Sequence, residues 1–166
     1  MGLKRAFVIG LCLAAVAAVV MLAAVIIRPP KIYISEICPS NSETSKKTAM
    51  QDKNGEPSDW IEIYNPTNKD ISLTGFSLSK NGGVDQPLGG YVIKAHDYII
   101  VYCSSAGFEN ADFPHADFSI GKVSEAEIIL KYDSFQCESI KMPKLNKGVS
   151  YSKNVKGEMY VSEPTP

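Results

Sequence analysis

The sequence predicts an all-β domain built as a sandwich of two sheets, preceded by one apolar helix. Beyond residue 31, short apolar or alternating runs are separated by turn-forming residues, and no long stretch keeps the helical period. The chain of 166 residues, 45% of them hydrophobic, is long enough for one domain with a core. These observations favour a single β domain plus a separate segment at the start.

The segment at the start, residues 6–27, carries no charged residue and is flanked by basic residues on both sides. As a helix rising about 1.5 Å per residue, it is long enough to cross a bilayer core of about 30 Å. A cleaved secretory signal is the alternative, but its apolar region usually has about 7–15 residues and ends in small residues. We therefore expect an uncleaved signal anchor.

The basic residues before the apolar segment favour an N-terminus in the cytoplasm and a C-terminal domain outside it, at the cell membrane. Pro29 and Pro30 would form a stiff spacer between the membrane and that domain. The expected layout is a short cytoplasmic head (1–5), a transmembrane anchor (6–27), a proline-rich spacer (28–31) and the β-sandwich domain (32–166).

The best-defined strand, residues 59–64, reads DWIEIY and stops at an Asn-Pro turn. Ile61 and Ile63 fall on one face, and Trp60, the only tryptophan, falls on the other. Proline ends the strand because it has no amide hydrogen for a sheet ladder. We expect Trp60, Ile61 and Ile63 to be structural anchors.

The other expected strands follow the same pattern of short runs and turns, and residues 104–118 are expected to form a loop. About eight or nine strands at this spacing are typical of an immunoglobulin-like sandwich. The expected ranges are 32–37, 71–78 with a bend at Gly75, 91–93, 98–103, 126–132, 134–140, 148–152 and 159–161.

The polar segment 40–58 is rich in turn formers and is expected to be a long exposed loop. Its run Asp52-Lys53-Asn54-Gly55 resembles a calcium loop only weakly, because further carboxylates and a final glutamate are missing. An ordinary Asn-Gly turn is the simpler interpretation, so we predict no metal and no cofactor. Because binding residues concentrate on loops carried by rigid sheets, the expected binding residues are Asp52, Asn54, Glu56 and Asp59.

Three cysteines lie outside the apolar segment, which allows at most one disulfide. All three pairings are open. In an exported domain we favour Cys103 with Cys137, because both lie in strand-like stretches.

The charge of the domain argues against a nucleic-acid partner. Beyond residue 31 the chain has 13 lysines, no arginine and 18 acidic residues, so its net charge is 13 − 18 = −5. An acidic domain without arginine is poorly suited to gripping phosphates or reading guanine edges.

Catalysis is not expected. The two histidines, His96 and His115, lie in predicted loops, and nucleophilic catalysis needs a nucleophile beside an oriented base. A triad of Cys103, His115 and Asp117 can be drawn, but nothing in the spacing requires these side chains to meet. We therefore predict that the chain is not an enzyme.

Six stretches of the domain carry a recognisable pattern by their order and spacing: 34–37 with Ser40-Asn41, 59–65, 71–78, 93–101, 148–151 and 164–166. Together they resemble the lamin-tail domain family, an immunoglobulin-like module that also occurs in bacterial exported and surface proteins. The resemblance implies a lamin-tail type of sandwich in an exported, membrane-anchored protein. The sequence departs from the family at His96, where the family tends to place a glycine in a turn.

The expected function is therefore that of a non-catalytic, membrane-anchored module outside the cytoplasm. It would bind a protein or a cell-surface or cell-envelope polymer, or would act as a structural spacer. The alternative is an accessory domain of a larger exported enzyme, for example a spore-coat kinase-like protein, whose catalytic part is absent from this chain. An open reading frame that continues past Pro166 would favour that alternative.

Overall fold

The computed structural model describes residue 9 and residues 29–41, 57–105, 113–121 and 125–165. The chain divides into two compact units, residues 1–30 and 31–166. Apart from Ile9, the predicted anchor at residues 6–27 lies outside the described residues. Within the described residues, no helix combines the length and the apolar character needed to span a membrane.

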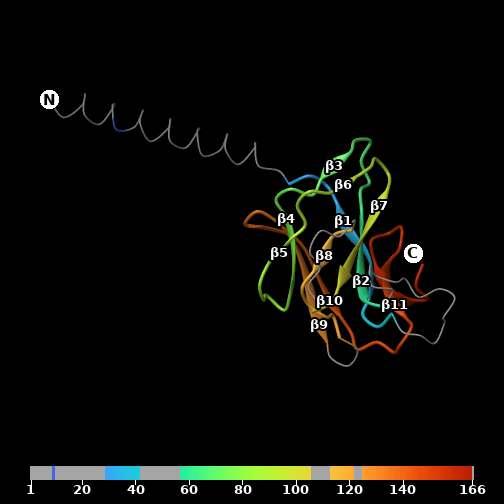
Figure 1. Ribbon diagram of the computed structural model, residues 1–166. Helices are drawn as coiled ribbons and strands as arrows, with labels where there is room; N and C mark the ends of the chain where they lie inside the picture. The colour runs from blue at the N-terminus through green and yellow to red at the C-terminus, as the bar shows by residue number, and fades with distance from the viewer. Residues whose placement is uncertain (1–8, 10–28, 42–56, 106–112, 122–124, 166) are drawn as a thin grey trace. The chain divides into compact units, whose positions relative to one another are not determined.

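The second unit is all-β, and its described residues form twelve strands (Figure 1). The strands are β1 (Tyr33–Cys38), β2 (Asp59–Tyr64), β3 (Ile71–Ser72), β4 (Phe76–Lys80), β5 (Gln86–Pro87), β6 (Val92–Ile93), β7 (Tyr98–Cys103), β8 (His115–Ala116), β9 (Ala126–Tyr132), β10 (Phe135–Met142), β11 (Ser150–Lys153) and β12 (Met159–Ser162).

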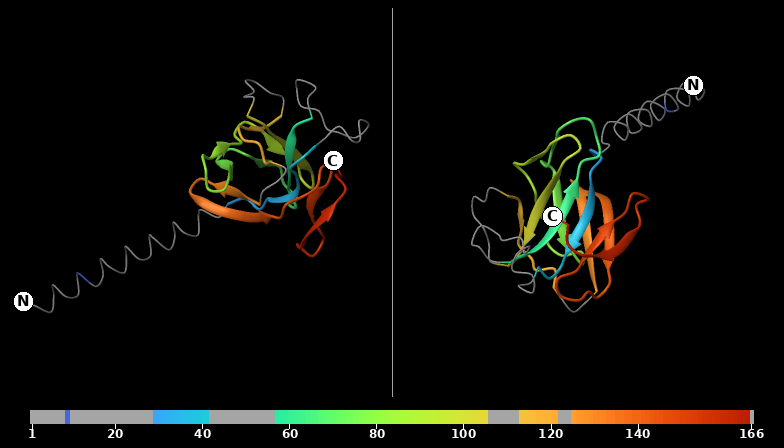
Figure 2. Two further views of the ribbon diagram at one scale, coloured as in Figure 1. Left: turned by 90° about the horizontal axis from the view of Figure 1, so that it is seen from below. Right: turned by 90° about the vertical axis from the view of Figure 1, so that its right-hand side faces the viewer.

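Two larger sheets form the two layers of a sandwich. The first has six strands in the order β12-β11-β1-β2-β7-β8, and the second has four in the order β10-β9-β4-β5. A small third sheet pairs β3 with β6. Figure 2 shows the hairpin of β11 and β12, in red, beside β1, in blue. The predicted β-sandwich is thus confirmed.

The hydrophobic core lies between the two larger sheets and takes side chains from both of them. This follows from strand alternation, because every second residue of a strand points to the same face. Burying each large aliphatic side chain is worth about 1.5–3 kcal/mol. The main contributors are Ile34, Ile37, Ile61, Ile63 and Val101 from the first sheet and Phe76, Leu78, Ile128, Leu130 and Ile140 from the second.

The segment 71–78, predicted as one bent strand, is two strands that belong to different sheets. β3 pairs with β6, whereas β4 pairs with β9 and β5. The break lies at Gly75, whose φ of 87° is in the region that glycine adopts readily. The bend was predicted correctly, but the single strand was wrong, because the turn moves the chain from one sheet to another.

Two short strands were not predicted, and several boundaries differ by one or two residues. β8 lies in the segment predicted as loop and pairs in parallel with β7, and β5 pairs with β4. β10 continues to Met142, and β11 begins at Ser150. Two-residue strands such as β5 and β8 leave almost no periodic signal, because their pairing comes from distant residues.

Candidate functional site

Asp59, the one predicted binding residue that the structure describes, is the first residue of β2. Its Oδ2 accepts hydrogen bonds from Ser119 Oγ (3.0 Å), Ile120 N (2.9 Å) and Gly121 N (3.2 Å). The carboxylate therefore fastens residues 119–121 to the start of β2. The other predicted binding residues, Asp52, Asn54 and Glu56, lie outside the described residues.

Trp60, Ile61 and Ile63, the predicted anchors, are all fully buried. Ile61 and Ile63 point into the core between the sheets. Trp60 points to the other face of β2, where it packs with Cys38 and Tyr102, its cross-strand neighbours on β1 and β7. The alternation read from DWIEIY therefore supplies two separate apolar clusters.

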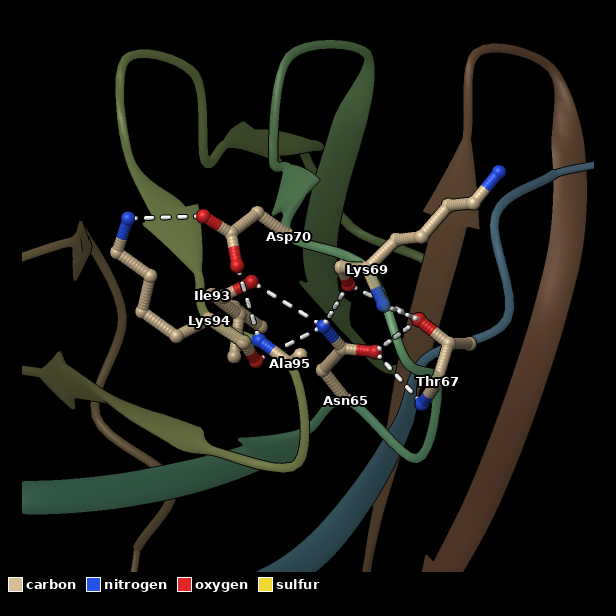
Figure 3. A network of polar contacts seen from close by, with 7 residues as sticks. All are labelled: Asn65, Thr67, Lys69, Asp70, Ile93, Lys94 and Ala95. Atoms are coloured by element: carbon tan, nitrogen blue, oxygen red, sulfur yellow. Dashed lines mark hydrogen bonds and ion pairs between the residues drawn. The ribbon is translucent and has the colours of Figure 1, made fainter.

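Asn65, directly after β2, is the centre of a buried polar network (Figure 3). Its Nδ2 donates to the carbonyls of Lys69 (2.7 Å), Ile93 (3.1 Å) and Lys94 (2.9 Å). Its Oδ1 accepts from Thr67 N (2.9 Å) and Thr67 Oγ1 (2.7 Å). One amide thereby joins the turn after β2 to the turn after β6.

The same two turns are joined a second time at their surface. Asp70 accepts a hydrogen bond from Ala95 N (3.0 Å) and pairs with Lys94 Nζ (2.8 Å), so the pKa of the Asp70 carboxyl is lowered by that lysine. His96 adopts a φ of 57°, the left-handed conformation in which glycine is favoured. Histidine therefore adopts a left-handed backbone here, at the position where the resemblance expects a glycine in a turn.

The C-terminal residues return to the first sheet beside two buried carboxylates. Glu36 on β1 accepts hydrogen bonds from Thr165 N (3.2 Å) and Thr165 Oγ1 (2.8 Å). Glu62, its cross-strand neighbour on β2, accepts from Ser35 Oγ. Burial raises the pKa of Glu62, the Ser35 hydroxyl opposes that shift, and the Glu36 charge adds to it.

A third polar cluster connects the two sheets. Glu138 on β10 pairs with Lys153 on β11 and accepts a hydrogen bond from Ile34 N (2.8 Å) on β1. The Lys153 ammonium also lies 4.6 Å from the centre of the Tyr33 ring. Because both side chains of the ion pair are mostly buried, this contact is part of the fold and is not exposed to a ligand.

The predicted Cys103–Cys137 disulfide is not formed, because Cys38, Cys103 and Cys137 are all free thiols. Cys103 points into the core from β7, whereas Cys137 lies at an irregularity in the edge strand β10 of the other sheet. Burial raises the pKa of Cys38 to about 12 and that of Cys103 well above its ordinary value. Both buried thiols are therefore protonated and unreactive at neutral pH.

The conceivable triad of Cys103, His115 and Asp117 is not assembled. His115 pairs with Tyr102 in the register of β7 and β8, so strand alternation places it on the face opposite to Cys103. His115 Nε2 lies 3.1 Å from Ser104 Oγ. Within the described residues, no group of three or more His, Cys, Asp or Glu side chains could hold a metal ion.

A cleft of about 520 Å³ lies beside one end of the four-stranded sheet, where β4 ends, β9 begins and β10 ends, and β11 forms another wall. Its apolar lining residues are the buried Ala126 and Met142 and the exposed Pro143. Asn81 is held in place by its N–H to Glu127 O (2.8 Å) and by its Oδ1, which accepts from Glu127 N (2.8 Å). The polar side chains of the lining are Asn81, Glu125, Glu127, Lys141 and Tyr151.

Sequence reasoning did not identify this cleft. The hairpin of β9 and β10 was predicted, and its register places Glu127 opposite Lys141. Asn81, however, comes from the turn after β4, far away in the sequence, and Tyr151 comes from the next strand, β11, and no local pattern links either residue to that hairpin.

Comparison with known proteins identifies the type of domain. The family model of the lamin tail domain matches residues 28–138. No curated protein matches the chain. The match ends within β10, so the resemblance noted at residues 148–151 and 164–166 lies beyond it. Because the match covers more than half of the sequence and the all-β sandwich agrees with it, the chain belongs to the lamin tail domain family.

Proposed function

We propose that this protein is a membrane-anchored binding module whose lamin-tail sandwich lies outside the cytoplasm. It would bind a protein or a cell-envelope polymer without catalysis, metal or cofactor. The observation that supports this proposal is a contrast among polar groups. Hydrogen bonds within the domain already use the polar side chains of Asn65, Asp59, Glu36 and Glu138. Lys141, Glu125 and the Tyr151 hydroxyl, which line the cleft, have no polar partner in the described part of the chain.

Two features support the non-catalytic and anchored parts of the proposal. The Cys103 thiol stays protonated, because burial and the nearby Asp59 charge raise its pKa. The apolar run of residues 6–27 has the length and the basic flanks of a signal anchor.

The binding function is tested by capture from cell-envelope fractions with the full chain in detergent micelles. We expect the wild-type chain to retain one or a few envelope components, and Lys141→Glu to lose them. Lys144→Glu is the matched control, because Lys144 is also exposed but does not line the cleft. Equal capture by both variants would contradict a binding role for the cleft.

The anchor is tested separately by membrane fractionation of the wild-type chain and of a deletion of residues 6–27. We expect the wild-type chain to resist alkaline extraction and the deletion to be soluble. Protease added to intact cells should cleave a tag placed after Pro166. A deletion that still sediments with the membrane, or a tag that is protected, would contradict this arrangement.

A further inference from the structure

The cleft beside β10 combines apolar lining residues with polar side chains that the fold uses only in part or not at all. Three lysines elsewhere in the domain have an acidic partner: Lys94 pairs with Asp70, Lys131 with Asp85 and Lys153 with Glu138. Lys141 in the cleft has none among the described residues. A cleft of about 520 Å³ falls within the range of roughly 300–1,000 Å³ usual for small-ligand sites.

The polar groups of the cleft offer both donors and acceptors. The Lys141 ammonium and the Asn81 Nδ2 can only donate, and the Glu125 carboxylate can only accept. One oxygen of Glu127 accepts from Ser139 Oγ, which leaves the second oxygen available. The Tyr151 hydroxyl can do both, and its ring packs against the core, so that the hydroxyl is held at a fixed place.

Asn81 is held in place more firmly than an ordinary exposed side chain. Its backbone N–H and its Oδ1 both bond to Glu127, and its φ is 52°. Two bonds and a restricted backbone fix the direction of the remaining Nδ2 donor. A donor positioned in this way loses little conformational entropy when a ligand binds.

A ligand that matches this arrangement has an apolar face and hydroxyl groups at its rim. A pyranose ring has both, because its C–H bonds form the faces and its hydroxyls, each a donor and an acceptor, form the edge. With two carboxylates and one ammonium, the ionisable side chains of the cleft carry a net negative charge. That charge favours neutral or amino sugars over acidic ones.

We propose that the cleft formed by Asn81, Glu125, Glu127, Lys141, Met142 and Tyr151 binds a segment of a neutral or amino-sugar polysaccharide. The ring face lies against Pro143, the exposed apolar residue of the lining, and the five polar side chains contact the hydroxyl or amino groups. This inference rests on the proposed binding function and specifies the ligand class for it.

The experiment is a calorimetric titration of the full chain in detergent micelles with four probes. These are the tetramers of N-acetylglucosamine, glucosamine and galacturonic acid, and a ten-residue peptide of alanine and lysine. We expect the first two to bind and the galacturonate tetramer to bind at least about 10-fold more weakly, because repulsion from the carboxylates opposes it.

Two variants with matched controls locate the binding. Lys141→Ala should lower the affinity for the more tightly bound tetramer about 10-fold. Tyr151→Phe, which keeps the ring and removes the hydroxyl, should lower the same affinity about 5-fold. Lys144→Ala and Tyr160→Phe change an exposed lysine and an exposed tyrosine outside the cleft and should leave the affinity unchanged. Thermal unfolding of each variant separates loss of binding from loss of folding.

Several outcomes would overturn the inference. They are binding to none of the saccharides, preference for galacturonate, binding of the peptide alone, or equal affinities for all variants. If envelope capture still depends on Lys141 while no saccharide binds, the saccharide inference fails and the proposed binding function stands. If both experiments are negative, both fail.

Discussion

Asn65 and Asn81 carry the same amide group, but the fold uses the two in different ways. Asn65 is fully buried, and its side chain makes five hydrogen bonds that join two turns. Asn81 is exposed, makes two bonds to Glu127, and keeps its Nδ2 directed at no partner among the described residues. The comparison separates polar residues that hold the sandwich together from polar residues that can serve a ligand.

The largest expected effect is on the buried member of this pair. Asn65→Ala would remove five side-chain hydrogen bonds and take the amide away from the Ile93 and Lys94 carbonyls and the Thr67 N–H. The Lys69 carbonyl would keep its hydrogen bond from Thr67 Oγ1 (3.0 Å). We expect the free energy of unfolding to fall by about 3–5 kcal/mol, measured by chemical denaturation. A loss below about 1 kcal/mol would mean that water replaces the amide and that the network is not structural.

The ion pair between the sheets should give the next largest effect. Glu138→Ala leaves the Lys153 ammonium and the Ile34 N–H unpaired in a mostly buried place. We expect the free energy of unfolding to fall by about 2–3 kcal/mol, measured by chemical denaturation. Asp85→Ala, which breaks the more exposed pair with Lys131, is the control and should cost less than about 1 kcal/mol. Similar losses of stability in both variants would show that the mostly buried ion pair contributes no more than the exposed one.

The exposed member of the pair should matter little for stability. Asn81→Gly keeps the left-handed backbone accessible and removes the amide. We expect the free energy of unfolding to stay within about 1 kcal/mol of the wild type. Saccharide affinity measured on the same sample should nevertheless fall, because the Nδ2 donor is lost. A strongly destabilised Asn81→Gly variant would place Asn81 with Asn65 among the structural residues.

The smallest effect concerns pH. Because burial raises the pKa of Glu62, the folded protein holds that proton more tightly than the unfolded chain does. This residue therefore contributes a loss of stability as pH rises above about 4.3, the ordinary pKa of glutamate, and the loss is complete above its folded pKa. Glu62→Gln should flatten the stability profile in that window, as followed by melting temperature against pH. If the profile of Glu62→Gln matched that of the wild type, the raised pKa of Glu62 would not be a source of the pH dependence.

Some parts of the fold were predictable because the information is local. The strands at residues 59–64, 98–103 and 126–132 have the predicted bounds, since alternation or an apolar run shows directly which residues face a core. The bend at Gly75 was also visible, because glycine tolerates the left-handed backbone that the turn requires.

Other parts depend on contacts that no local pattern records. Asp59 was predicted to bind a ligand beside a loop. Its carboxylate instead accepts hydrogen bonds from residues 119–121, about 60 positions away. Cys103 and Cys137 both lie in strands, as predicted, yet in different sheets and as free thiols. The cleft needs Asn81 from the turn after β4, Lys141 from β10 and Tyr151 from β11.

The sequence by itself determined the all-β class, most strand positions and the apolar faces of β2, because side-chain alternation is written into consecutive residues. Only the tertiary structure decided which strands share a sheet and which carboxylates make hydrogen bonds within the domain. It also decided that polar groups without a partner lie together in the cleft. Those outcomes depend on the closure of long loops, and the polar residues of the cleft meet only after that closure.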